Sequence, residues 1–216
     1  MDKGLQYCLF LILCLSISHS NFSQFQKSFS GELHYIIERV DKKDSVKAEM
    51  IIFAKDSMLR IVNFNSETGK QELIKHLRLN KSYLLIDTPK QKFAVRTNEH
   101  LEKDTIVTYN FRKKLGFKRI AGLTCRKFKV KQKMVKNELN FYVYNKIPSY
   151  YLNAFKELPG LPTLYFVAND HGLFKYTLKE IKRKDPPSQL FTFGIDYKIV
   201  TFEEFSEEFS RLYESE

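Results

Sequence analysis

The tetrapeptide Asn169-Asp170-His171-Gly172 is the part of the chain that most resembles an enzyme site, because it places a carboxylate beside an imidazole. These two groups are common partners in general acid–base catalysis. The same stretch lies between two strand-like segments and ends in glycine, which is also the composition of a β-hairpin loop. We interpret it as a turn.

The remaining histidines and carboxylates do not form a metal or catalytic motif. The histidines are scattered, with no carboxylate or second histidine at the spacing of metal ligands: His34, His76, His100 and His171. Glu203-Glu204 and Glu207-Glu208 are adjacent pairs, but they fall on the polar face of a predicted helix, where solvation accounts for them. The sequence also lacks a glycine-rich phosphate loop and the signatures of proteases, lipases and kinases. We therefore predict no enzymatic activity, no metal and no cofactor.

Lysine and arginine gather in the second half of the chain. The clusters are Arg112-Lys113-Lys114, Lys118-Arg119, Arg126 to Lys136 and Lys182-Arg183-Lys184. Alternate side chains of a strand share one face, so the third cluster predicts a basic outward face made by Lys127, Lys129, Lys131 and Lys133. Such a face either contacts anionic headgroups or an acidic partner, or simply keeps a sheet soluble. The formal net charge of +11 favours anionic neighbours.

The first two dozen residues have the pattern of a secretory signal peptide. Lys3 precedes the apolar run 5–17, and Ser18-His19-Ser20 then places small residues near a cleavage site. The apolar run is shorter than the roughly 20 residues that a spanning helix needs. Lipidation at Cys14 would require a small residue before it, and Leu13 is not small. We predict a signal peptide at 1–20, cleaved near Ser20 or Ser23, and a periplasmic protein, leaving outer-membrane association or secretion open.

Residues 21–216 are enough for one domain with a substantial core. Beyond the predicted leader the only cysteine is Cys125, so no intrachain disulfide is expected, and we predict that its thiol is buried. Lysines interleaved with aromatic residues also suit single-stranded nucleic acid, but predicted export argues against that partner. The oligomeric state is left open.

Short strand-like segments separated by polar breaks predict an all-β (β-rich α+β) fold with a curved antiparallel sheet. The segments include 31–40, 46–55, 58–64, 72–79, 83–87, 93–95, 125–130, 139–144, 164–168 and 174–178. Two short covering helices are expected. One spans 149–156, and the other follows an N-cap at Thr201 and carries an apolar stripe for the sheet: Phe202, Phe205, Phe209 and Leu212.

Two segments of the second half stand at a definite separation. The first reads Ile120-Ala121-Gly122-Leu123-Thr124-Cys125-Arg126-Lys127-Phe128, and the second reads Phe155-Lys156-Glu157-Leu158-Pro159-Gly160-Leu161-Pro162. With the leader and the strand-like segment between them, they resemble the envelope proteins named for a Gly-Leu-Pro-Gly-Leu-Ile motif. They are also similar to related families with the fold of the lipoprotein carrier LolA. Glu157 and Pro162 replace the first glycine and the closing isoleucine of that motif.

The resemblance implies an incomplete barrel whose concavity, in LolA-like and LppX-like proteins, shelters acyl chains. The expected wall residues could equally be plain core: Phe93, Val95, Phe128, Val130, Phe141, Phe166 and Phe174. Pro159, Gly160 and Pro162 predict a rigid reversal, since proline fixes φ and glycine permits positive φ. That reversal is either a structural turn at the barrel rim or the lip of a ligand mouth.

We therefore expect an exported, non-enzymatic envelope protein that binds an apolar or amphiphilic, lipid-like ligand in the concavity of a half-barrel. The alternative is an accessory module that contacts another envelope protein or an anionic membrane surface through its basic outer face.

Overall fold

The computed structural model describes residues 28–40, 48–65, 69–97, 109–132, 135–152, 155, 158–169 and 172–213. The predicted leader lies outside these ranges, as do His100, Lys133, Asp170 and His171. In the described part of the chain, no helix is long and apolar enough to cross a membrane.

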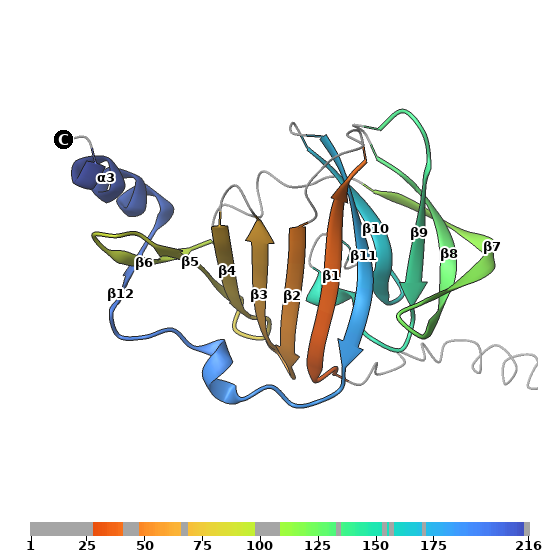
Figure 1. Cartoon of the computed structure of the whole chain (residues 1–216), viewed down its shortest axis with the longest axis horizontal. Helices are drawn as coiled ribbons and strands as arrows, with labels where there is room; N and C mark the ends of the chain where they lie inside the picture. Colours follow the sequence, from red (N-terminus) through yellow and green to blue (C-terminus); the bar gives the residue numbers. More distant parts are fainter. Residues whose placement is uncertain are drawn as a thin grey trace, which may run out of the picture.

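A single open sheet of 12 strands makes up the fold, and it does not close into a barrel (Figure 1). The strands are β1 (Gly31–Arg39), β2 (Ala48–Lys55), β3 (Met58–Asn65), β4 (Gly69–His76), β5 (Lys81–Asp87), β6 (Lys92–Arg96), β7 (Asn110–Ile120), β8 (Leu123–Lys131), β9 (Leu139–Tyr144), β10 (Leu161–Asn169), β11 (Gly172–Lys182) and β12 (Tyr197–Val200). Their order across the sheet is β12-β6-β5-β4-β3-β2-β1-β11-β10-β9-β8-β7. The predicted β-rich fold is confirmed.

The predicted antiparallel pairing holds for every strand pair but one. β12 lies parallel to β6, with Tyr197 opposite Lys92. Parallel neighbours need a long crossover, and here residues 183–196 carry the chain from β11 near the middle of the sheet to its far edge (Figure 1). The crossover contains the 3₁₀ turn η3 (Ser188–Phe191), whose Leu190 carbonyl accepts a hydrogen bond from Arg60 Nη1 at 3.0 Å.

Alternating apolar residues explain most of the strands. Leu33 and Tyr35 of β1 are buried, while Glu32 and His34, which alternate with them, are half-buried. The predicted turn at 55–57 is confirmed as Asp56-Ser57, and Asp56 takes a positive φ of 53°. The predicted turn at 88–91 is also present, closed by Thr88 N–H donating to the Gln91 carbonyl at 3.1 Å.

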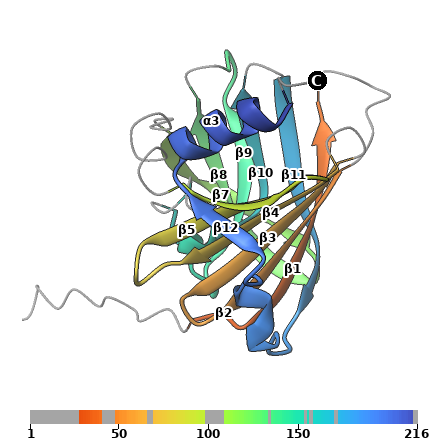
Figure 2. The same cartoon turned by 90° about the vertical axis from the view of Figure 1, so that its left-hand side faces the viewer.

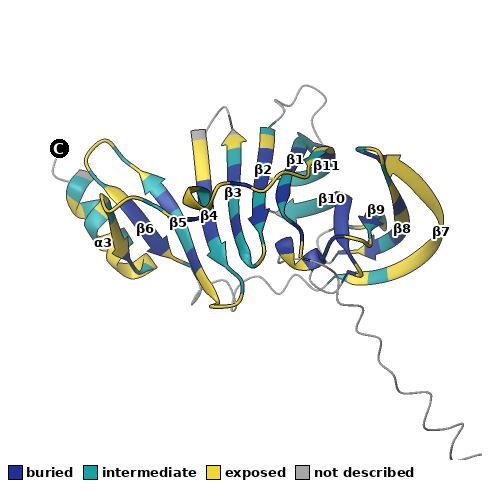
Figure 3. Ribbon diagram, turned by 90° about the horizontal axis from the view of Figure 1, so that it is seen from below, coloured by how far each residue is buried: buried dark blue, intermediate teal, exposed yellow. Residues whose placement is uncertain are grey.

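The sheet curls at one end, where β10, β9, β8 and β7 bend round (Figure 3). Between β9 and β10, the described residues include η1 (Ser149–Tyr151), which lies inside this bend. The sequence predicted a helix at 149–156, but the described residues form 3₁₀-type turns instead. Leu152 N–H donates to the Ser149 carbonyl and Leu158 N–H to the Phe155 carbonyl, each at 2.9 Å.

The other end of the sheet is covered by α3 (Phe202–Tyr213), which lies across β6 and β12 (Figure 2). Its predicted N-cap is confirmed. Glu204 N–H donates to Thr201 Oγ1 at 3.2 Å, and Thr201 N–H donates to Glu204 Oε2 at 2.7 Å, which is a capping box.

Only part of the predicted apolar stripe of α3 reaches the sheet. Phe205 and Leu212 pack against the buried cluster beneath the helix, with the Phe205 and Phe93 ring centroids 5.3 Å apart. Phe202 and Phe209 remain 56% and 39% exposed. The stripe prediction was wrong for these two because β12 is only four residues long and offers little sheet to cover.

Candidate functional site

The β7–β8 hairpin forms one edge of the sheet, at the opposite end from α3 (Figures 1 and 3). β7 pairs with β8, and within the described residues no strand pairs with its other side. Ile120 is the one buried residue of β7, and nearly all the others are exposed. The sequence analysis recognised the basic clusters of β7 but did not predict a strand there.

The hairpin carries charge of a single sign. From Asn110 to Lys131 the chain contains no aspartate or glutamate. The cationic residues of the two strands are Arg112, Lys113, Lys114, Lys118, Arg119, Arg126, Lys127, Lys129 and Lys131. Arg112 has an acidic partner from outside the hairpin, since its Nη2 lies 3.0 Å from Glu138 Oε1. The hairpin therefore presents a concentrated positive surface.

The predicted alternation along β8 is confirmed from Lys127 to Lys131. Phe128 and Val130 are buried, Lys127 and Lys129 are half-buried, and Lys131 is exposed. Arg112 lies directly opposite Lys129 on β7, and side chains of directly opposed residues share a face. The basic face is therefore two strands wide, and Lys133 falls outside the described residues.

A bulge interrupts β7 in the middle of this surface. Lys113 pairs with Phe128 and Phe117 with Arg126, so the three residues from Lys114 to Gly116 stand opposite Lys127 alone. Gly116 has φ of 118°, a conformation that other residues rarely adopt. An added Cβ there would lie 3.9 Å from Lys127 Cδ, so backbone conformation rather than crowding requires the glycine.

The bulge exposes two large apolar side chains among the cations. Leu115 is 99% exposed and Phe117 is 63% exposed. Arg126 stands over the Phe117 ring, 5.2 Å from its centroid, and Lys118 Nζ stands 5.6 Å from the centroid of Tyr142. These cation–π contacts hold positive charge beside apolar surface. An apolar pair between two lysine clusters is the sequence signal that could have revealed this site.

The seven residues predicted to line a ligand cavity do not come together. Phe93 and Val95 lie beneath α3, in a cluster separate from the main core. Phe128, Val130 and Phe141 belong to the main core, and Phe166 packs against it. Phe174 is half-buried on β11, with Arg39 above its ring at 6.0 Å. Six of these side chains therefore belong to, or pack against, two separate core clusters of the described residues, and Phe174 belongs to neither.

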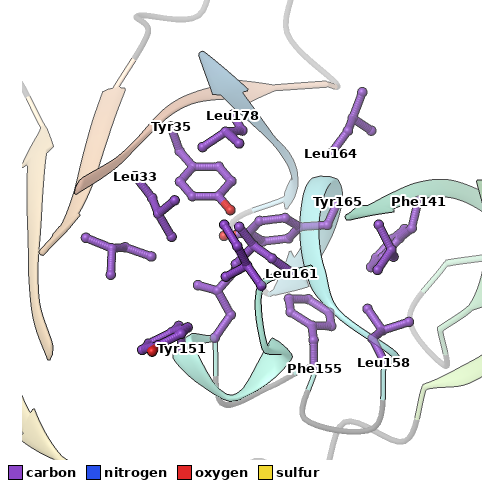
Figure 4. Packing of buried hydrophobic residues seen from close by; sticks show 14 of the residues in the cluster. Leu33, Tyr35, Phe141, Tyr151, Phe155, Leu158, Leu161, Leu164, Tyr165 and Leu178 are labelled. Atoms are coloured by element: carbon purple, nitrogen blue, oxygen red, sulfur yellow. The ribbon is translucent and has the colours of Figure 1, made fainter. Parts of the chain in front are cut away.

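Aromatic side chains fill the inside of the curled end (Figure 4). The Tyr165 ring centroid lies 4.9 Å from that of Phe155 and 5.8 Å from that of Tyr35. Burial raises the pKa of both tyrosines well above its ordinary value, so their hydroxyls stay protonated. The Tyr35 hydroxyl donates to the Pro162 carbonyl at 2.9 Å.

The predicted rim turn is a close-packed junction. Gly160 does not have positive φ, so that reason for the glycine was wrong. A Cβ at Gly160 would lie 2.4 Å from the Tyr144 carbonyl oxygen, and only glycine fits against that strand. Pro162 is buried in β10 beside a register shift, where a missing N–H is tolerated. Pro159 is exposed.

The other candidate groups do not gather into a shared site within the described residues. Cys125 is fully buried, as predicted, and burial raises the pKa of its thiol. His34 Nε2 lies 2.8 Å from Glu32 Oε2, a pairing that the sequence analysis missed because it compared ligand spacings and not strand faces. Across the described residues, no three His, Cys, Asp or Glu side chains gather where they could hold a metal.

A shallow pocket of about 280 Å³ opens beside the turn between β2 and β3. It is lined by Ser28, Asp56, Ser57, Leu77, Arg78 and Tyr150. Asp56 and Arg78 bring one charge of each sign, so the pocket has no net preference for an anion or a cation.

No protein-family model and no curated protein matches this chain. Among solved structures, the chain is similar to one described as the structure of PNGF-II in C2 space group, with 12% sequence identity and a TM-score of 0.48. The match covers 84% of this chain and 32% of that one, so this chain spans about a third of its length. The comparisons therefore assign this chain to no family.

Proposed function

We propose that this chain is an exported, non-enzymatic binding protein of the bacterial envelope that attaches to an anionic partner through its β7–β8 hairpin. The observation that carries the proposal is the hairpin's single-sign charge, with no acidic residue between Asn110 and Lys131. The open, curved sheet also supports the half-barrel that the resemblance to LolA-like proteins implies.

The contrast with the middle of the sheet argues against a mere solubility role. There, lysines on β11 stand beside glutamates on β1. Lys175 Nζ lies 2.5 Å from Glu38 Oε2, and Lys182 Nζ lies 3.4 Å from Glu32 Oε2. Surfaces that only need to be soluble mix both signs in this way. The hairpin instead concentrates repelling charges, which an anionic partner would neutralise.

The anionic partner is expected to meet side chains rather than the free backbone edge. Lysines and bulges are the usual protection of an edge strand against pairing with another strand. β7 has both, with the bulge at 114–116 between Lys113 and Lys118. Strand addition to β7 is therefore disfavoured, while its charged side chains stay accessible.

An apolar ligand in the curled end is a second proposal. The observation that favours it is that Phe155, at the centre of the aromatic cluster, lies in a segment of 3₁₀-type turns rather than in a strand. Phe155 takes no part in strand pairing, so an apolar ligand would displace its ring without breaking the strand ladder. Native mass spectrometry after mild purification should then detect bound lipid, and a protein that never carries or takes up lipid contradicts this proposal.

Two matched double variants test the hairpin proposal. Lys113→Gln with Lys114→Gln removes two charges from the hairpin, and Lys179→Gln with Lys184→Gln removes two from exposed positions elsewhere. Binding is measured to polyglutamate-coated surfaces and to vesicles containing phosphatidylglycerol. We expect the first variant to lose affinity for at least one surface while the second binds as the parent does. Equal losses would show that net charge alone matters, and would overturn the proposal.

A further inference from the structure

We infer that the anionic partner is a lipid bilayer, and that Leu115 and Phe117 enter its interfacial region while the flanking cations contact lipid phosphates. This inference rests on the proposed function of the hairpin and adds the chemistry of its partner.

The bulge places apolar and charged groups in the arrangement that a bilayer interface accepts. Leu115 is 99% exposed, and lysines precede it at 113 and 114. Lys118 and Arg119 follow Phe117 directly. A strand advances about 3.3 Å per residue, so Lys113, Lys114 and Lys118 lie within about 10 Å of Leu115 along the strand, and Arg119 lies within about 13 Å. Lysine and arginine stems can lie along apolar surface while their charged ends reach the phosphates.

The position of the hairpin leaves it free to meet a flat surface. β7 is the last strand of the sheet and lies at one end of the long axis of the molecule (Figure 1). Its exposed residues continue along nearly the whole strand (Figure 3). A bilayer can receive the projecting Leu115 without a preformed pocket, whereas an acidic protein would need a pocket that matches it. The geometry therefore favours a bilayer over a protein partner.

The absence of tryptophan from the sequence gives a direct probe of insertion. Leu115→Trp places a single fluorophore in the bulge. Ile195→Trp places one at another fully exposed site, just before β12, which is at the opposite end of the sheet from β7. Both proteins are produced from the full 216-residue sequence. They are mixed with vesicles of phosphatidylcholine alone, or of phosphatidylcholine with phosphatidylglycerol, with and without brominated acyl chains.

We expect the Leu115→Trp fluorescence to shift to the blue, and to be quenched by brominated chains, only on the anionic vesicles. The Ile195→Trp fluorescence should change little. The variant with Leu115→Ser and Phe117→Ser should partition roughly tenfold less into anionic vesicles, because it loses the burial of two large apolar side chains. Its matched control, with Leu79→Ser and Ile195→Ser, removes two other exposed apolar residues and should partition as the parent does.

The outcomes separate the inference from the proposed function. Binding to anionic vesicles without a Leu115→Trp shift would leave only peripheral electrostatic contact and overturn the insertion. Binding to polyglutamate but not to anionic vesicles would keep the anionic partner and overturn the bilayer. Binding to neither surface would overturn both.

Discussion

Some side chains form hydrogen bonds between segments that do not pair as strands. Tyr151 is the clearest case, because its hydroxyl accepts the Phe29 N–H at 2.7 Å and donates to the Phe29 carbonyl at 3.0 Å. The two rings also meet edge to face, with centroids 6.1 Å apart. One residue of η1 thereby fixes the chain just before β1.

Replacing Tyr151 with phenylalanine keeps the ring and removes the hydroxyl. The Phe29 N–H is then left buried without its partner, which costs about 1–3 kcal/mol. Urea unfolding should show this loss as a lower midpoint with an unchanged slope. The comparison is Tyr150→Phe, which removes the hydroxyl that donates to Tyr151 Oη at 3.3 Å but leaves both bonds between Tyr151 and Phe29 in place. Because Tyr150 is 37% exposed, we expect this change to cost less than about 0.5 kcal/mol. Equal effects of the two variants would contradict the anchoring role of Tyr151.

Between elements, a charged triplet ties β3 and β4 to the crossover between β11 and β12. Glu72 of β4 is buried and accepts hydrogen bonds from Arg60 of β3 and from Lys70. Burial alone would raise the pKa of Glu72, but the hydrogen bonds from Lys70 and Arg60 outweigh it and lower the pKa below its ordinary value of 4.5. Arg60 also holds the η3 turn through the Leu190 carbonyl.

The lowered pKa of Glu72 predicts a loss of stability in acid. Ionised Glu72 contributes fully above pH 4.5, and its contribution disappears as the pH falls through the lower pKa of the folded state. Unfolding free energies measured from pH 7 downward should therefore fall less steeply for Glu72→Gln than for the parent. The variant should be less stable than the parent at neutral pH. If the free energy of unfolding falls equally steeply with pH in the parent and in Glu72→Gln, Glu72 does not govern the loss of stability in acid.

The inward and outward assignment of β8 is tested within one strand. Replacing Lys127, Lys129 and Lys131 with glutamine removes charge from the outward face, and should change the free energy of unfolding by no more than about 0.5 kcal/mol per site. Phe128→Ala empties a buried position and should cost about 3–5 kcal/mol. Both are measured by urea unfolding. An unfolded triple variant would mean that these lysines are packed rather than solvated.

At the scale of the whole molecule, the sheet rests on cores of unequal size. The large core joins β1, β2, β3 and the curled strands with the described residues between β9 and β10. Beneath α3 the buried residues are Phe93, Val95 and Val200, with a few partly buried neighbours. Regions with few buried apolar contacts open locally at lower free energy.

The smaller core beneath α3 predicts that amides at this end of the sheet exchange first. The amides of β12 and α3 should exchange with deuterium well before those of β1, β10 and β11, when peptides are followed by mass spectrometry. Phe205→Ala should speed exchange in β12 and α3 while leaving β1 and β10 unchanged, since Phe205 packs only in the smaller core. Uniform exchange across both ends would indicate a single cooperative unit.

The strands with alternating apolar residues could be predicted from sequence, and so could the N-cap at Thr201. β7 could not, because its cations and bulge at 114–116 break the period of two. β12 was missed since its parallel pairing with β6 depends on a crossover that no local pattern specifies. The apolar residues between β9 and β10 were visible in the sequence, but the core into which Phe155 packs exists only once the sheet has curled.

The pairing of β1 with β11 has a consequence for how the chain folds. β1 acquires β2 almost at once, but its other edge faces β11, whose residues are made some 140 positions later. Closing so large a loop costs entropy before any contact repays it, so pairs of this kind form slowly. Until Lys182 is available, β1 presents an apolar strand with an open edge, and such edges recruit other chains. The middle of the finished sheet is therefore the part of the nascent protein with the greatest need of a chaperone.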